Sequence, residues 1–157
     1  MSAVKERRKT KKALESFTAT IAAKSSNEGF ARAMAASFAA RLDPTVEELA
    51  DIKTALSEAV TNCVVHAYKN SRGNGEIRIK GSIFEDGRIV FEIKDKGCGM
   101  EDVEKCLQPM YTCDPEGERS GMGFTVMESF CDGLKVRSKP GKGTTVVLIK
   151  KIGRGDI

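Results

Sequence analysis

Hydrophobic residues recur along this chain with two different periods, and the changes of period mark its predicted elements. Apolar and polar residues alternate between Leu14 and Ala23, which predicts a first strand. Ser25 and Glu28 stand three positions apart and predict a capping box at the start of a helix. The next apolar residues recur every four positions, which is typical of a helix with one apolar edge: Phe30, Met34, Phe38 and Leu42.

A second, longer helix follows the break at Asp43-Pro44. Thr45 and Glu48 form another capping-box pair, and apolar residues then recur at three- and four-residue spacing as far as Ala67. This pattern predicts a helix of about 25 residues.

After residue 75 the period changes to two, which predicts strands joined in hairpins. One hairpin turns at Asp86-Gly87 and the other at residues 140–143. Between them we expect a short helical run from Glu101, an irregular segment over residues 106–120 that acts as a lid, and a helix over residues 121–131. The predicted fold is an α+β two-layer sandwich, with a mixed, mostly antiparallel sheet and helices on one face.

The length of the chain predicts its domain organisation, and the distribution of charge along it bears on its partners. We expect one domain over residues 14–152, between a disordered basic tail at 1–13 and a short tail at 153–157. The net charge is +4, but residues 1–12 hold six basic residues and one acidic residue, so the rest of the chain sums to −1. A nucleic-acid-binding domain shows basic charge clustered on a folded face. The near-neutral body therefore argues against nucleic acid as a partner.

The cysteines and the hydropathy favour a cytoplasmic protein. Five cysteines, an odd number, occur without a Cys-x-x-Cys pair, which favours reduced thiols. No apolar stretch approaches the roughly 18 residues that a membrane span requires. We therefore expect neither a membrane partner nor export.

Three polar residues at four-residue spacing follow one side of the predicted long helix: Glu58, Asn62 and His66. Such a stripe can line a pocket while the opposite side of the helix packs on the sheet. Taken alone, it is more often the solvated face of an amphipathic helix. A single histidine is likewise more often a boundary residue than a ligand.

Two glycine-containing segments extend this pattern. Asp95 ends the third predicted strand and is followed by Gly97 and Gly99, and a carboxylate there can accept a hydrogen bond from the exocyclic amine of a base. Gly121 and Gly123 begin a helix, where free backbone N–H groups can bind a phosphate. By itself, each segment is also typical of an ordinary turn or helix start.

Together and in this order, the segments resemble the N box and the two glycine boxes of the GHKL (Bergerat-type) ATP-binding superfamily. That superfamily includes histidine kinases, type II topoisomerases and small anti-sigma kinases. Gly143 and Thr144, before the last strand, belong to the same set. Further stretches are similar to the anti-sigma serine kinases of sporulation: residues 28–32, 42–45, 52–53, 57–62 and 118–124. The resemblance runs from about Phe17 to Lys150.

The resemblance implies ATP and Mg²⁺ as cofactors and suggests which residues bind them. Asn62 would help to hold Mg²⁺, and Asp95 would recognise adenine with support from Thr144. His66 would belong to the same nucleotide pocket. Four glycines would open the pocket or cradle the phosphates: Gly97, Gly99, Gly121 and Gly123.

The resemblance also implies catalytic and partner-binding residues. Arg119 would stabilise charge on the γ-phosphoryl group, and Glu58 would orient or deprotonate the attacking hydroxyl. Glu28 and Arg32 would contact partner proteins, and the protein would be a homodimer. Without the family argument, Glu28 and Arg32 are equally an exposed i,i+4 ion pair.

The type of kinase follows from what the chain contains. A histidine kinase carries its own acceptor histidine, whereas the single histidine here, His66, lies in the predicted pocket helix. A topoisomerase-type ATPase needs a longer chain. The resemblance therefore implies an anti-sigma factor that binds and inhibits a sporulation sigma factor and phosphorylates an anti-anti-sigma protein on serine. Two alternatives stay open: a sigma-binding module with ATP as a structural ligand, and an anti-sigma kinase of a stress-response sigma factor.

Overall fold

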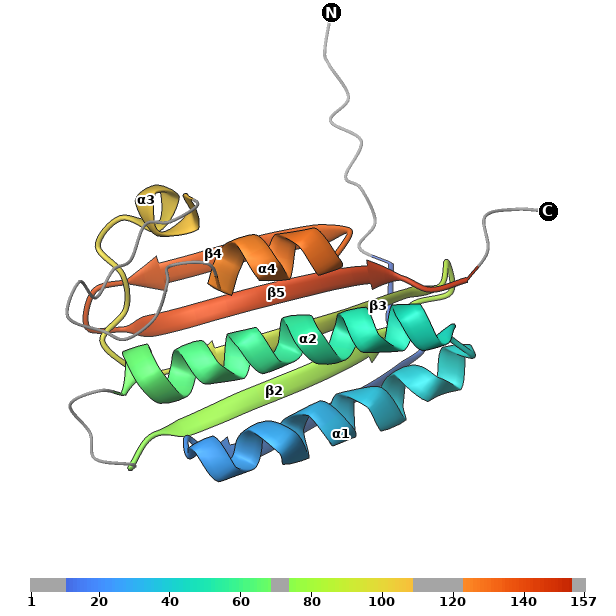
Figure 1. The fold of residues 1–157 in the computed structure, drawn as a ribbon, viewed down its shortest axis with the longest axis horizontal. Helices are drawn as coiled ribbons and strands as arrows, with labels where there is room; N and C mark the ends of the chain where they lie inside the picture. Colours follow the sequence, from blue (N-terminus) through green and yellow to red (C-terminus); the bar gives the residue numbers. More distant parts are fainter. Residues whose placement is uncertain (1–10, 69–73, 109–122, 154–157) are drawn as a thin grey trace, which may run out of the picture.

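The computed structural model describes residues 11–68, 74–108 and 123–153 of the chain. No helix within these ranges has the length and apolar composition that crossing a membrane requires. The elements follow one another as shown in Figure 1: β1 (Glu15–Ala22), η1 (Ser25–Asn27), α1 (Glu28–Ala39), η2 (Ala40–Leu42), α2 (Val46–Asn62), η3 (Cys63–Ala67), β2 (Glu76–Ile83), β3 (Arg88–Asp95), α3 (Val103–Leu107), α4 (Gly123–Phe130), β4 (Gly133–Lys139) and β5 (Gly143–Lys151).

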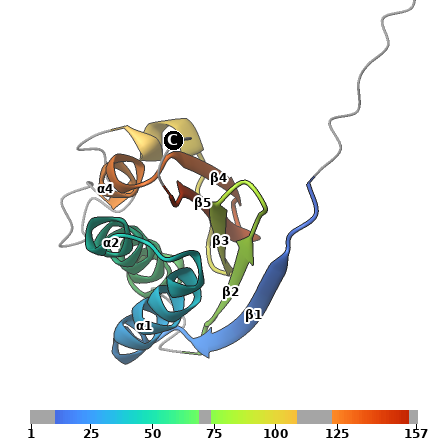
Figure 2. The same ribbon diagram turned by 90° about the vertical axis from the view of Figure 1, so that its right-hand side faces the viewer.

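The strands form one sheet in the order β1-β2-β3-β5-β4, and every neighbouring pair is antiparallel. Helices α1, α2 and α4 lie together on one face of this sheet (Figure 2). The predicted α+β two-layer sandwich is confirmed. A parallel pairing, which a mixed sheet would contain, does not occur among the described strands. Both predicted hairpins form, and Gly87 has a φ of 82° in the turn between β2 and β3.

The first helix begins differently from its prediction. Ser25–Asn27 form a turn of 3-10 helix, and α1 starts at Glu28 without a side-chain hydrogen bond at its N-cap. The predicted capping box is therefore wrong, because the 3-10 turn places Ser25 before the N-cap position. The predicted apolar edge is also only partly buried, since Phe30 is 57% exposed. The residues that α1 buries are Ala31, Ala35, Phe38 and Ala39.

The long second helix forms in two parts. Its predicted capping box is confirmed: the Glu48 N–H donates to the Thr45 hydroxyl at 3.1 Å, and the Thr45 N–H donates to the Glu48 carboxylate at 2.9 Å. The α-helical part, α2, ends at Asn62, and the last five residues, Cys63–Ala67, form a π-helix. Such π-helical turns occur frequently at functional sites.

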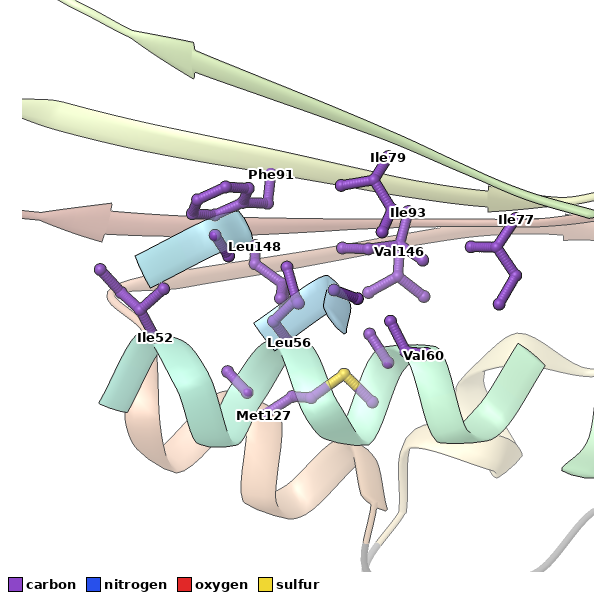
Figure 3. Packing of buried hydrophobic residues seen from close by; sticks show 14 of the residues in the cluster. Ile52, Leu56, Val60, Ile77, Ile79, Phe91, Ile93, Met127, Val146 and Leu148 are labelled. Carbon is purple, nitrogen blue, oxygen red and sulfur yellow. The ribbon is translucent and has the colours of Figure 1, made fainter. Parts of the chain in front are cut away.

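The core lies between α2 and the sheet (Figure 3). Leu56 and Val60 of α2 are completely buried, and Met127 brings α4 against the same helix. The half-buried Glu58 and Asn62 lie on other positions of α2, so this helix combines an apolar side with a polar one. The strand residues that pack against α2 come from β2, β3 and β5: Ile77, Ile79, Phe91, Ile93, Val146 and Leu148.

The loop after β3 packs against the β4–β5 hairpin through two glycines with positive φ. Gly99 has a φ of +70°, and a Cβ there would lie 2.0 Å from the carbonyl oxygen of Lys139. Gly143 has a φ of +102°, and a Cβ there would lie 2.2 Å from the carbonyl oxygen of Asp95. Gly141, in the hairpin turn, has a φ of +73° with open space around it. Close packing therefore requires glycine at the first two positions in addition to the backbone conformation.

We expect Gly143→Ala to destabilise the fold more than Gly141→Ala. Gly141→Ala adds only the cost of a side chain in the left-handed conformation, about 1–2 kcal/mol. Gly143→Ala adds a clash with the Asp95 backbone, so its free energy of unfolding should fall by on the order of 3 kcal/mol or more. Denaturant unfolding followed by circular dichroism measures both variants. Equal losses would mean that the loop moves away from the hairpin without cost.

Candidate functional site

Asp95 is a buried carboxylate at the end of β3, where it is 4% exposed. Its Oδ1 atom accepts two backbone hydrogen bonds, from the Gly97 N–H at 2.9 Å and from the Thr144 N–H at 3.1 Å. The first donor belongs to the loop after β3 and the second to the start of β5. One side chain therefore ties both segments to the end of the sheet. Because burial of a carboxylate is costly without hydrogen-bond donors, these contacts are part of what stabilises it there.

The second oxygen of Asp95 faces the end of α2. Asp95 Oδ2 lies 3.5 Å from the Cys63 thiol, which donates to it, and Cys63 directly follows Asn62. A thiol is a weak donor, so this oxygen keeps the capacity to accept a stronger hydrogen bond. Burial, the negative charge of Asp95 and the hydrogen bond to it raise the pKa of the Cys63 thiol well above its usual value. The thiol therefore stays neutral beside the carboxylate.

A hydroxyl pair lies next to this carboxylate, on the β4–β5 hairpin. The hydroxyl oxygens of Thr144 and Ser138 are 2.7 Å apart. Ser138 donates to the Gly143 carbonyl at 3.1 Å and accepts the Met100 N–H at 2.8 Å. Because a hydroxyl has one proton, Thr144 must be the donor in the bond between the two hydroxyls. Its oxygen keeps lone pairs that can accept a further hydrogen bond.

The glycines of the loop after β3 have a packing role. A Cβ at Gly97 would lie 2.2 Å from the carbonyl oxygen of Ala67, and this oxygen also accepts the Cys98 N–H at 2.9 Å. The Cys98 carbonyl in turn accepts a backbone N–H of the β4–β5 turn at 2.7 Å. The loop is thus held between the π-helical turn and the hairpin. Gly97 and Gly99 are needed for this approach, and their opening of a pocket stays a prediction.

The start of α4 lies against the polar side of α2. A Cβ at Gly123 would lie 3.3 Å from Asn62 Oδ1 and 3.5 Å from Glu58 Oε2. The structure therefore brings Glu58, Asn62 and Gly123 together. His66 lies beyond them in the π-helical turn, where the four-residue repeat of the stripe ends. Its backbone carbonyl accepts a hydrogen bond from the Cys98 thiol at 3.4 Å.

Glu28 and Arg32 belong to a polar network between α1 and α2. Arg32 Nη1 lies 3.4 Å from Glu28 Oε1 and donates to Ser57 Oγ at 3.3 Å. The Thr61 hydroxyl lies 3.3 Å from Glu28 Oε2 and 2.7 Å from the Ser57 carbonyl oxygen. The buried Ser57 therefore accepts a hydrogen bond from the ion pair, whereas the single hydroxyl proton of the buried Thr61 is donated to the Ser57 carbonyl. Neither Ser57 nor Thr61 is predicted from the sequence to belong to a site, although they show the same four-residue spacing as the polar stripe and stand one position before it.

Several predicted features lie outside the described residues. They are Arg119, Gly121 and most of the lid predicted at residues 106–120. Within the described part of the chain, no group of three or more His, Cys, Asp or Glu side chains is placed to hold a metal ion.

The cysteines do not all match their prediction. Cys63, Cys98 and Cys131 are free thiols, as expected. Cys106 is disulfide-bonded, so the prediction of reduced cysteines throughout is wrong at this position. The number and spacing of cysteines do not tell which sulfur atoms the fold brings within bonding distance.

Comparison with known proteins places this geometry in a family. Residues 21–150 match the family model described as a histidine kinase-like ATPase domain. A curated protein of Caldanaerobacter subterraneus subsp. tengcongensis, named anti-sigma F factor, is 58% identical over 131 residues, which cover 83% of this chain and 90% of that protein. Another anti-sigma F factor, of Thermoanaerobacter sp., is 57% identical over 130 residues, which cover 83% of this chain and 89% of that protein.

A solved structure has the same fold. It contains the RsbU and RsbW domains of a Mycobacterium tuberculosis protein and superposes with a TM-score of 0.66 at 21% identity. The match covers 90% of this chain but 33% of the other, so this chain spans about a third of that protein. At this identity the likeness supports the α+β fold alone.

We expect Cys98 to react with iodoacetamide before Cys63. Cys98 is exposed, whereas burial and the raised pKa of Cys63 keep its reactive thiolate form scarce at about pH 8. Mass spectrometry of peptides from briefly alkylated native protein should give a ratio of about tenfold or more in favour of Cys98. Unfolded protein, in which both thiols are exposed, serves as the control. Similar labelling of both cysteines in the native protein would contradict the buried position of Cys63.

Proposed function

The chain belongs to the family of histidine kinase-like ATPase domains and, within it, to the anti-sigma F factors, and on this premise we propose that it inhibits a sigma factor as a nucleotide-dependent kinase. It would bind a sporulation sigma factor and phosphorylate an anti-anti-sigma protein on serine, with ATP and Mg²⁺. The observation that carries the proposal is that a buried carboxylate and a polar pair of side chains both lie at the end of α2. Asp95 contacts Cys63, and the neighbouring Asn62 lies with Glu58 against the start of α4.

The residues around Asp95 fit an adenine ring. The base offers an exocyclic amine, a donor stronger than the thiol that now contacts Asp95 Oδ2. Because Oδ1 is already held by two N–H groups, the carboxylate is fixed in orientation before a ligand arrives. The Thr144 hydroxyl would accept a second hydrogen bond beside it. This arrangement supports the adenine-binding role proposed for Asp95 and Thr144.

The start of α4 fits the phosphates and their metal ion. Magnesium in nucleotide sites is held largely by phosphate oxygens and water with one or two protein ligands, so a protein cage is not required. The Asn62 side-chain oxygen, next to Gly123, would be such a ligand. The first backbone N–H groups of α4 would bind phosphate, which the positive end of a helix favours. We extend the same role to Gly121, a supporting place in the pocket to His66, and charge stabilisation to Arg119.

Glu58 is the proposed catalytic base. The bound nucleotide supplies the phosphoryl group, and the chain's own task is to position the acceptor and remove its proton. The Glu58 carboxylate reaches the start of α4, where the phosphates are proposed to lie. There it would orient the serine hydroxyl and accept its proton, a contribution of about 10²–10⁴-fold in rate.

Glu28 and Arg32 are the proposed contacts to partner proteins. Ser57 accepts a hydrogen bond from Arg32, and the Thr61 hydroxyl lies beside Glu28, so a partner would meet the ion pair already oriented. Such pre-ordering lowers the entropy lost on binding. The same hydroxyl residues directly precede Glu58 and Asn62, so partner and nucleotide would act on one helix and influence each other's affinity reciprocally.

We also propose a homodimer that works in the cytoplasm, where a sigma factor acts. The edge of the fold formed by β1 and α1 supports a second copy. A groove of about 480 Å³ lies between them, bordered by Phe17, Phe30 and Met34. Phe30 is 57% exposed there, and β1 is an edge strand of the sheet. An exposed aromatic ring beside an unpaired strand edge is typical of an interaction surface.

Glu58→Gln is expected to abolish phosphotransfer while nucleotide and sigma-factor binding persist, because glutamine keeps the size but cannot accept the proton. Transfer from γ-labelled ATP to a serine of the antagonist protein measures the reaction, with a loss of about 10²-fold or more. Glu47→Gln, an exposed change in the first turn of the same helix, is the matched control. Absence of transfer by the unchanged protein would favour a module that uses ATP only as a structural ligand.

Asp95→Asn is expected to weaken binding of Mg-ATP about tenfold to a hundredfold. The asparagine oxygen can still accept the N–H groups of Gly97 and Thr144, so the fold should persist. Its amide nitrogen would replace Oδ2 and oppose the adenine amine, donor against donor. Calorimetric titration measures the affinity, and thermal unfolding without nucleotide is the control. An unchanged affinity would remove Asp95 from the nucleotide site.

A further inference from the structure

The face of the sheet opposite the helices is strongly basic. We call it the outer sheet face; it consists of the strand residues that alternate with the core residues, and no described helix covers it (Figure 2). Its acidic residues are Glu76 and Glu92. Its basic residues come from four strands: Arg78, Lys80, Arg88, Lys94, Lys135, Arg137, Lys139 and Lys151.

The fold therefore gathers basic residues on one face, although basic and acidic residues are interspersed along the sequence. Eight basic and two acidic residues give the outer sheet face a charge of +6. The whole chain carries +4, so all remaining residues together sum to −2, including the basic segment at 1–12. Along the sequence, the basic residues of the folded part alternate with apolar residues, so no clustered basic face is visible there. Four strands that are distant along the chain assemble such a face.

Some of the basic residues lie next to an acidic one: Lys80 stands opposite Glu92, and Arg137 lies 4.0 Å from the Glu92 carboxylate.

Other basic residues of the face are arranged at a cost to stability. Arg78 stands directly opposite Lys94 in the β2–β3 pairing, and Arg88 stands opposite Lys151 in the β3–β5 pairing. Like charges directly opposite each other destabilise a sheet. Arg88 is partly compensated by Asp86 at 2.8 Å, whereas Arg78 and Lys94 form no ion pair with another described residue. Such a local conflict is expected at a binding surface rather than in a purely structural one.

We propose that the outer sheet face binds the phosphate backbone of duplex nucleic acid, without sequence preference. The centre of a protein–protein interface is depleted of lysine and enriched in aromatic residues. Here eight basic and two acidic residues surround three half-buried aliphatic residues at the middle of the face, Val90, Val147 and Ile149, and the one aromatic ring beside them is that of Phe84, under the Arg88 guanidinium. Protein–DNA interfaces are more polar and more positive, which matches this surface. The scarcity of aromatic rings also disfavours single strands, whose bases stack on such rings.

The chemistry of the face explains why the binding would not read sequence. Phosphate contacts position a duplex, and base edges are read by elements that enter a groove. The outer sheet face is built from side chains of a sheet with no helix projecting from it (Figure 2). Hydroxyl residues beside the basic ones, such as Thr18, Thr20 and Thr145, would donate further hydrogen bonds to phosphate. The proposal does not depend on the kinase function.

Fluorescence anisotropy of a labelled duplex DNA with the full chain tests the proposal. We expect binding at about 50 mM salt that weakens steeply towards 200 mM, because phosphate contacts release counterions. The triple variant Arg78→Gln, Lys94→Gln and Lys135→Gln should bind at least about tenfold more weakly, with a salt slope shallower by about 3. Its melting temperature should stay equal or rise, because one like-charge pair is removed.

A second triple variant tests whether DNA binding depends on the position of the charges or only on their number. Lys24→Gln, Lys53→Gln and Lys105→Gln remove the same charge from positions outside the outer sheet face. This control should bind DNA nearly as well as the unchanged chain. No binding by the unchanged chain, or equal losses in both triple variants, would overturn the proposal. Tighter binding of a labelled poly-glutamate peptide than of DNA would also overturn it, in favour of an acidic protein partner.

Discussion

The burial of one carboxylate sets the geometry at the end of the sheet. Asp95 can be buried only if donors come close, and they come from the loop after β3 and from the start of β5. That approach brings backbone so near to backbone that a Cβ at Gly97 or Gly143 would lie 2.2 Å from a carbonyl oxygen. Burial of the aspartate therefore requires glycine at the neighbouring positions, so these residues constrain the backbone together. The result is a rigid carboxylate with one oxygen still able to accept a hydrogen bond.

Helix α2 connects this carboxylate to everything else that is proposed for the protein. Its apolar side packs on the sheet through Leu56 and Val60, while other positions contact α1 and α4, and Cys63, directly after the helix, contacts Asp95. Ser57 and Thr61 reach the ion pair of α1, and the next residues in each case face the start of α4. A single rigid element thus carries both the proposed nucleotide contacts and the support of the proposed partner contacts.

The two faces of the sheet differ in the interactions that they can make. The inner face is apolar and stabilises the fold because its side chains are buried, mainly beneath α2. The outer face is covered by no described helix, and its basic residues on β2 and β4 are exposed, so these positions can differ in charge without loss of the fold. Here they are predominantly basic, and Arg78 directly opposite Lys94 shows that stability alone did not set them. The same strands therefore supply a core on one side and a charged surface on the other.

Local patterns in the sequence were sufficient for most elements and for the motifs of the site. The alternation around β2 and β3, the capping box of Thr45 and Glu48, and the turn at Gly87 all act within a few residues, so they are readable from the chain. The same signals failed at Ser25 and Phe30, where a 3-10 turn and the packing against α2 override propensity.

Other features depend on residues that are distant in the sequence and meet only in the folded chain. The support of Arg32 by Ser57 crosses two helices, the approach of Cys63 to Asp95 joins a helix to a strand, and the disulfide of Cys106 depends on where sulfur atoms meet. The outer sheet face is the clearest case, because alternation hides its basic residues among apolar ones along each strand. The sequence alone determined which segments are helices and strands and which motifs they carry, since these follow from neighbouring residues. Only the tertiary structure decided which side chains share a surface, because that depends on how the strands align.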